Sequence, residues 1–294
     1  MRNFWESIYS PNYITGYNPF LLRHMNEAIK KLVYAVNNRN KIVVYGTSSV
    51  ESICSVASLS LILRYLNADV EYLIHEGGES RKSVECKDVE DAVAFLGADL
   101  LITIGLDLKS QKEERLCKDL NIDLIVIENR RTVRKRNYVY INPRQKGCNY
   151  KYKNLSLSAL TFKLMQAVAI SYNMKNINKY LDLIFIGGQW AKVCPRGENG
   201  VILKKGRKFL INTNNNGLKA IMNLDEINEL NDDDIKNIIE LITPTRSTVG
   251  VVNNARIILE LLTTVDKDRA KQIAKYLKKL KKLKVILQWK NKNL

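Results

Sequence analysis

Short apolar segments alternate with helical patterns through the first half of this chain, and that alternation constrains its fold more than any other feature. The strand-like runs, rich in Val, Ile and Leu, cover residues 41–45, 69–74, 100–104, 123–127 and 138–141. The helical patterns between them cover residues 54–66, 84–96 and 111–120. Strands joined through helices pair in parallel, and a parallel sheet is covered on both faces. We therefore predict an α/β fold with a doubly wound, mainly parallel sheet of about five strands.

Helical patterns dominate the rest of the chain, so the sheet is expected to be followed by a mostly helical subdomain. The helices are predicted at residues 155–171, 181–186, 202–211, 218–222, 232–241 and 255–262. The first of these is read as a long amphipathic helix, and Gly206 makes the third the least regular. Asp232, Asp233 and Asp234 are expected to cap a helix and charge its start, not to bind a metal. The last thirty residues read as one basic helix.

The chain carries a net charge of +17, which favours contact with a polyanion. A composition rich in Lys, Asn and Ile is also what an AT-rich genome produces, so the charge alone leaves both explanations open. The charge is clustered, however, and we take the clusters as candidate contacts to nucleic acid. They comprise Arg130, Arg131, Arg134, Lys135, Arg136, Lys278, Lys279, Lys281 and Lys282.

Other classes of function receive no support from the composition. The five cysteines are widely spaced and form no C-x-x-C pair, so we expect isolated, reduced thiols. His24 and His75 lie apart from any cysteine or aspartate cluster, which argues against zinc. No apolar run approaches the roughly 18–20 residues that span a bilayer, and the N-terminus lacks the apolar core of a signal peptide. We expect a cytoplasmic protein with no membrane partner.

The turn after the first strand carries the strongest functional signal. It reads Thr47-Ser48-Ser49-Val50-Glu51-Ser52, and further segments follow in a fixed order. These are Phe4-Trp5, Asn18-Pro19-Phe20-Leu21-Leu22, Ile141-Asn142-Pro143-Arg144, Cys148-Asn149-Tyr150, Asn154-Leu155, Phe162-Lys163-Leu164, Gly197-Glu198-Asn199, Gly206 and Gly217-Leu218-Lys219-Ala220. In this ordered series the chain resembles the RecJ-like single-stranded-DNA exonucleases of the DHH phosphoesterase superfamily, over nearly its whole length.

The resemblance implies an active site that has lost its metal ligands. In that family, aspartates after the first strand and an Asp-His-His motif hold two catalytic divalent metals. Thr47, Ser49 and Glu51 stand at the first-strand aspartates, and Glu128, Asn129 and Arg130 at the Asp-His-His motif. The resemblance places two further family aspartates at Gly105, after the strand at residues 100–104, and at Lys192. An ammonium or guanidinium group at such a site repels a divalent cation. We infer that Lys192 or Arg130 pairs with Glu51 or Glu128, in place of the metal.

The resemblance also implies a division of the chain into a DHH-like sheet domain at residues 1–172, a helical second half of the core at 173–262, and a connector-like basic helix at 263–294. The family's arginine-bearing loop corresponds to residues 243–251, where both arginine positions are lost, so phosphate binding by this loop is not expected. The second domain of the family, with its Gly-Gly-His motif, has no counterpart in the sequence.

We predict a catalytically inactive RecJ-like protein without a cofactor, which binds single-stranded nucleic acid or a replication or repair partner. The alternative is a 5′–3′ single-stranded-DNA exonuclease or phosphoesterase with a rearranged site that uses Mn²⁺ or Mg²⁺. Asp107 lies two residues beyond Gly105, on the same face of an extended backbone, so Glu51, Asp107 and Glu128 could hold one metal ion. A module that binds only protein, or a gene product without a role, also remains open.

Overall fold

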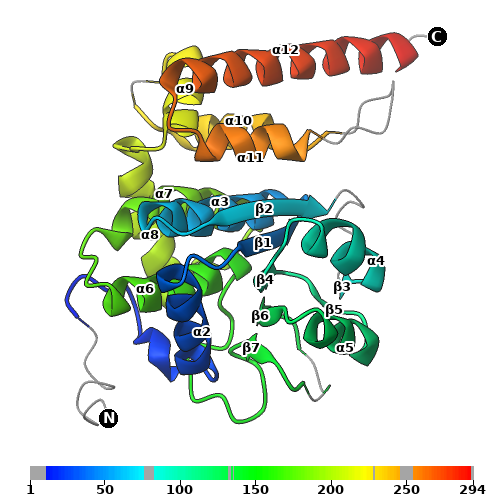
Figure 1. Cartoon of the computed structure of the whole chain (residues 1–294). Helices are drawn as coiled ribbons and strands as arrows, with labels where there is room; N and C mark the ends of the chain where they lie inside the picture. The colour runs from blue at the N-terminus through cyan, green and yellow to red at the C-terminus, as the bar shows by residue number, and fades with distance from the viewer. Residues whose placement is uncertain are drawn as a thin grey trace.

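A five-stranded parallel sheet lies at the centre of the N-terminal half (Figure 1). Its strands, in spatial order, are β2 (Val70–His75), β1 (Ile42–Thr47), β4 (Leu100–Ile104), β6 (Asp123–Ile127) and β7 (Val139–Ile141). Every neighbouring pair is parallel. The predicted fold class is therefore confirmed: a doubly wound α/β sheet followed by a helical region. All residues of the central strands β1 and β4 are buried, which explains why both read as apolar runs.

This structure is a computed structural model that describes residues 11–75, 83–131, 134, 136–227, 229–245 and 254–292. Of residues 284–292 it describes the backbone alone. Within the part it describes, no helix combines the length and the apolar character needed to cross a membrane. Lys135 and residues 246–251 of the predicted loop lie outside the described residues.

The helices pack on both faces of the sheet because successive strand residues point in opposite directions. Val44, Ile102 and Ile125 face the larger core, which is built with helices from both halves of the chain. Val43 and Leu101 face a smaller core on the opposite side. The helical elements are η1 (Pro19–Leu21), α2 (Met25–Asn37), α3 (Val50–Tyr65), α4 (Cys86–Asp88), η2 (Val89–Ala94), α5 (Gln111–Asp119), α6 (Leu157–Ser171), η3 (Ile177–Tyr180), α7 (Leu181–Trp190), α8 (Gly197–Ile211), α9 (Asn216–Leu224), α10 (Asp232–Leu241), α11 (Ala255–Thr263) and α12 (Lys267–Lys292).

Helices α9 to α12 form a layer of their own beyond α3 and β2 (Figure 1). Helix α11 contacts both α3 and β2, and α12 packs on α9. Asn231, and not one of the three aspartates, caps α10, and Asp234 closes a capping box. The aspartates occupy the first turn, so the predicted negative charge at the start of this helix is confirmed, whereas their predicted role as the cap is wrong. The division of the chain at residues 172 and 262 stays a prediction.

Two predicted elements differ from the structure, each for a local reason, and a third, the helix at residues 202–211, is confirmed but more regular than expected. Residues 84–96 are not one helix: Val84 belongs to β3 (Ser83–Val84), which pairs with β5 (Asp107–Leu108), and a short helix and a π-helix follow. Helix α6 is not amphipathic, because its residues from Leu157 to Ala169 are all buried. Helix α8 continues through Gly206, where a Cβ atom would lie 2.5 Å from Cβ of Phe185, so the glycine allows close packing against α7.

Candidate functional site

Hydroxyl groups close the turn at the carboxyl end of β1. Ser49 caps α3 by accepting a hydrogen bond from the Ser52 amide, at 3.2 Å, and its hydroxyl lies 3.1 Å from that of Thr47. The Ser52 hydroxyl accepts from the Thr47 amide at 2.9 Å and donates to the Ile104 carbonyl on β4 at 3.3 Å. These short hydroxyl side chains are therefore bonded to the turn and to the neighbouring strand.

Glu51 lies in the first turn of α3 and reaches the start of α6. Its carboxylate accepts from the Ser158 amide at 3.1 Å and from the Ser158 hydroxyl at 3.3 Å. A helix N-terminus attracts negative charge, so the carboxylate occupies a position that would suit an anion. Burial, with a smaller contribution from the nearby charge of Glu128, raises the pKa of Glu51 to about 7, although the hydrogen bonds from Ser158 lower it. Near neutral pH, a large share of the Glu51 carboxyl is thus protonated.

Glu128 and Arg130 form an ion pair at the end of β6. Glu128 is 3% exposed. One of its carboxylate oxygens accepts from the amides of Asn129 and Arg130, at 2.9 and 3.1 Å. The other accepts from Nε of Arg130 at 2.7 Å and from Nη2 of the same side chain. Burial alone would lower the pKa of Arg130, but the hydrogen bond and charge of Glu128 raise it above its ordinary value. The Arg130 guanidinium is therefore charged at physiological pH.

Neighbouring loops hold this pair in position. The Asn142 side chain after β7 donates to the Arg130 carbonyl at 2.8 Å, and the Asn129 side chain donates to the Leu155 carbonyl at 3.2 Å. Gly105, after β4, has a φ of +73°, and a Cβ atom there would lie 2.7 Å from Cδ2 of Leu157. A side chain at residue 105 would therefore require Leu157 to shift.

The remaining predicted site residues point elsewhere. Asp107 accepts from Nε of Arg136 at 3.0 Å and from the Tyr138 hydroxyl at 2.6 Å, so its carboxylate is engaged beside β5. Lys192 follows α7, is exposed, and forms no ion pair with any residue that the structure describes. Of the two cations considered, Arg130 makes the pair with Glu128. Across the described ranges, no three His, Cys, Asp or Glu side chains come together as a group that could hold a metal.

The basic clusters are only partly available to a ligand. Arg134 donates to the Leu108 carbonyl at 2.8 Å, and the Arg136 side chain is 7% exposed in its pair with Asp107. Lys278 pairs with Asp225 at 2.6 Å, and Lys281 with Glu240 at 3.2 Å. The exposed members that the structure describes are Arg131, Lys279 and Lys282.

A groove of about 540 Å³ opens beside Glu51 and Asn129. Arg144 and Arg196 line it and are both exposed. Arg144 is anchored by bonds to the Lys153 carbonyl, at 3.0 Å, and to the Asn154 side chain, whereas no interaction of the Arg196 side chain is found in the described part of the chain. Sequence reasoning did not assign either arginine to the site. Arg144 could have been found, because it follows β7 at the same edge of the sheet, but Arg196 reaches the groove only through α8.

Comparisons with known proteins place these features in context. A family model described as the DHH family, N-terminal domain, matches residues 41–188. The chain is 26% identical over 273 residues to the single-stranded-DNA-specific exonuclease RecJ of Bacillus subtilis, covering 90% of this chain and 33% of that protein. It is also 26% identical over 272 residues to RecJ of Haemophilus influenzae, covering 87% of this chain and 47% of that protein. The chain thus spans between a third and a half of the length of these relatives.

A solved structure shares the fold. The crystal structure of the exonuclease RecJ bound to manganese superposes with a TM-score of 0.76 at 21% identity, covering 88% of this chain and 66% of that one. At this identity the superposition establishes the arrangement of the sheet and helices. It leaves the chemistry of the site to be argued from this chain's own residues.

Proposed function

This chain belongs to the DHH family, and from that premise we propose that it is a catalytically inactive RecJ-like protein that binds single-stranded nucleic acid. The observation that carries the first part is the ion pair between Glu128 and Arg130. A carboxylate that already accepts two backbone amides and a guanidinium has few lone pairs left for a metal.

The charge of the site supports the same conclusion. Arg130 offsets the charge of Glu128, and Glu51 is partly neutral near pH 7 because its pKa is about 7. Two unit charges about 4 Å apart interact by about 4 kcal/mol at an effective dielectric near 20, and a divalent ion doubles that repulsion from Arg130. A metal would have to displace the guanidinium and leave it unpaired, which costs further free energy.

The nucleic-acid part rests on the groove and the charge. The relatives are named as single-stranded-DNA-specific exonucleases. In this chain, Arg144 and Arg196 line a groove beside the altered site, and the net charge is +17. Guanidinium groups bind phosphate oxygens with two parallel hydrogen bonds, and single strands are held largely through such backbone contacts. The strand would thus lie over Glu51 without meeting a metal.

The binding claim is tested by fluorescence anisotropy with a labelled single-stranded oligonucleotide across a range of salt concentrations. We expect affinity to fall as salt rises, with a slope of about −0.7 per phosphate contact. Arg196→Ala should weaken binding and reduce the slope by about one contact. The matched control is Arg115→Ala, which removes an exposed arginine on α5. Equal affinity of the two variants would remove Arg196 from the interface.

A second assay separates binding from cleavage. The chain is incubated with single-stranded DNA and Mn²⁺, and released nucleotides are counted over time. We expect none. Release that Glu128→Gln abolishes would establish the rearranged exonuclease instead. If the oligonucleotide does not bind at all, or binds without dependence on salt, the nucleic-acid part is wrong, and a replication or repair protein becomes the partner to seek.

A further inference from the structure

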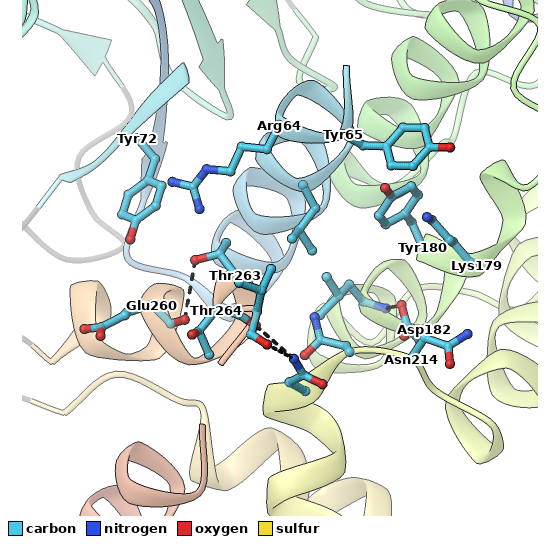
Figure 2. Close-up of a pocket in the computed structure, with 15 residues that line it drawn as sticks. Arg64, Tyr65, Tyr72, Lys179, Tyr180, Asp182, Asn214, Glu260, Thr263 and Thr264 are labelled. Carbon is cyan, nitrogen blue, oxygen red and sulfur yellow. Dashed lines mark hydrogen bonds between the residues drawn. The ribbon is translucent and has the colours of Figure 1, made fainter. Parts of the chain in front are cut away.

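A second pocket of about 660 Å³ lies at the other end of α3 (Figure 2). It forms where the end of α3 and β2 meet η3, the loop before α9 and the end of α11. Glu51 and Tyr65 are near opposite ends of α3, so at 1.5 Å per residue the pocket is about 20 Å from the Glu51 turn. Its volume is within the range of roughly 300–1,000 Å³ that is usual for small-molecule sites.

Three tyrosine rings and two cations line this pocket. The Lys179 ammonium lies 4.7 Å from the ring centroid of Tyr65 and 5.0 Å from that of Tyr180. The Arg64 guanidinium lies 5.3 Å from the ring centroid of Tyr72. Figure 2 shows these as two groups on opposite sides of the pocket. Tyr65 is 64% exposed, so much of its ring is available to a ligand.

The acidic side chains of the pocket already have polar partners, whereas its cations have no acidic partner among the described residues. Asp182 accepts from the Thr213 hydroxyl at 2.5 Å, and Glu260 pairs with Arg269 at 2.7 Å. Arg64 and Lys179 form no ion pair within the described ranges, and their charges rest on aromatic rings. Positive charge beside an open ring therefore characterises the pocket, and both features are available for binding.

We propose that this pocket is a nucleotide-binding site, in which a base stacks on the exposed part of the Tyr65 ring and the phosphate pairs with Lys179 beside that ring. A base and an aromatic side chain stack with about 1–3 kcal/mol, whatever the base. The Asn214 side chain is exposed in the pocket and could donate to a base edge (Figure 2). A phosphate gives Lys179 an anionic partner without disturbing any ion pair described above. The site does not depend on the proposed function, because the groove beside Glu51 is a separate surface.

The test is isothermal titration calorimetry of adenosine 5′-monophosphate into the full chain. We expect one site per chain. Tyr65→Ala should weaken binding at least about fivefold, and Tyr65→Phe should retain it because the ring remains. The matched control is Tyr34→Ala, which removes a tyrosine that is 62% exposed on α2. Lys179→Gln should also weaken nucleotide binding, and Lys179→Arg should retain it because the positive charge remains.

The outcomes distinguish this site from the groove. Loss of nucleotide binding in Tyr65→Ala, with oligonucleotide binding intact, supports a site for free nucleotides. If Tyr65→Ala loses both nucleotide and oligonucleotide binding, the pocket binds a nucleotide that is part of a strand. Nucleotide binding in a chain that binds no oligonucleotide supports the pocket and refutes the proposed function alone. The inference is overturned if the nucleotide does not bind, or if Tyr65→Ala and Tyr34→Ala bind it equally well.

Discussion

Removing the guanidinium of Arg130 should destabilise the fold while leaving the surrounding backbone intact. In Arg130→Met the Glu128 carboxylate, whose side chain is 4% exposed, keeps its two backbone donors but loses its cation. Breaking a fully buried pair costs about 3–5 kcal/mol, whereas an exposed pair contributes at most about 1 kcal/mol. The Arg130 side chain is 38% exposed, so we place the loss between these cases, at about 2 kcal/mol.

A double-mutant cycle isolates this interaction. Glu128→Gln keeps an acceptor for the two amides and removes the charge, so adding it to Arg130→Met should recover much of the stability. Urea unfolding at pH 7, analysed by linear extrapolation, gives the four stabilities, and we expect a coupling of about 1–2 kcal/mol. The control cycle uses the surface pair Lys31–Asp123, whose side chains are 35% and 53% exposed. If the Glu128–Arg130 coupling does not exceed that of the control, the pair stabilises the site no more than an exposed surface pair would.

Two further predictions concern residues at the same edge of the sheet. The pKa of Glu51 is about 7 in the folded protein against an ordinary 4.5. Between these pH values the folded state holds a proton that the unfolded chain has lost. The contribution of this proton to the free energy of unfolding is therefore full below about pH 4.5 and is lost as pH rises through 7. Glu51→Gln should remove this decline and raise the free energy of unfolding at pH 8 by about 2 kcal/mol relative to the original chain. Urea unfolding at pH 5 and at pH 8 measures the effect, and a variant with the same pH profile as the original chain would contradict the prediction. Gly105→Ala should lower the free energy of unfolding by about 1 kcal/mol more than Gly97→Ala does, again measured by urea unfolding. Both glycines have a positive φ, but only a side chain at residue 105 would contact Leu157. Equal losses would show that Leu157 moves aside without cost.

Much of the sheet could be predicted from the sequence because its strands β1 and β4 are buried along their whole length. Strands β4 and β6 begin and end where their apolar runs do. The start of α3 was predicted four residues late, since the first turn of that helix is defined by the Ser49 cap and not by apolar spacing. Val84 was assigned to a helix because a two-residue strand carries no periodic signal, and its partner lies more than twenty residues away along the chain.

The candidate site was predictable where its contacts are local. The resemblance led us to expect Lys192 or Arg130 to pair with Glu51 or Glu128, and of these pairs the structure contains Glu128–Arg130, whose members are two residues apart. The partner of Glu51 could not be deduced in the same way. Ser158 is 107 positions away, and only the packing of α6 against α3 brings its amide to the carboxylate. The face to which Lys192 points likewise depends on where α7 ends.

Calorimetric titration of Mn²⁺ into the full chain tests the central claim most directly. The Arg130 guanidinium holds Glu128, and Glu51 is bonded to the start of α6. We therefore predict no saturable heat and no change in thermal stability with Mn²⁺. One ion bound per chain, with a signal that Glu128→Gln or Glu51→Gln removes, would show that the metal displaces the arginine and would contradict the account.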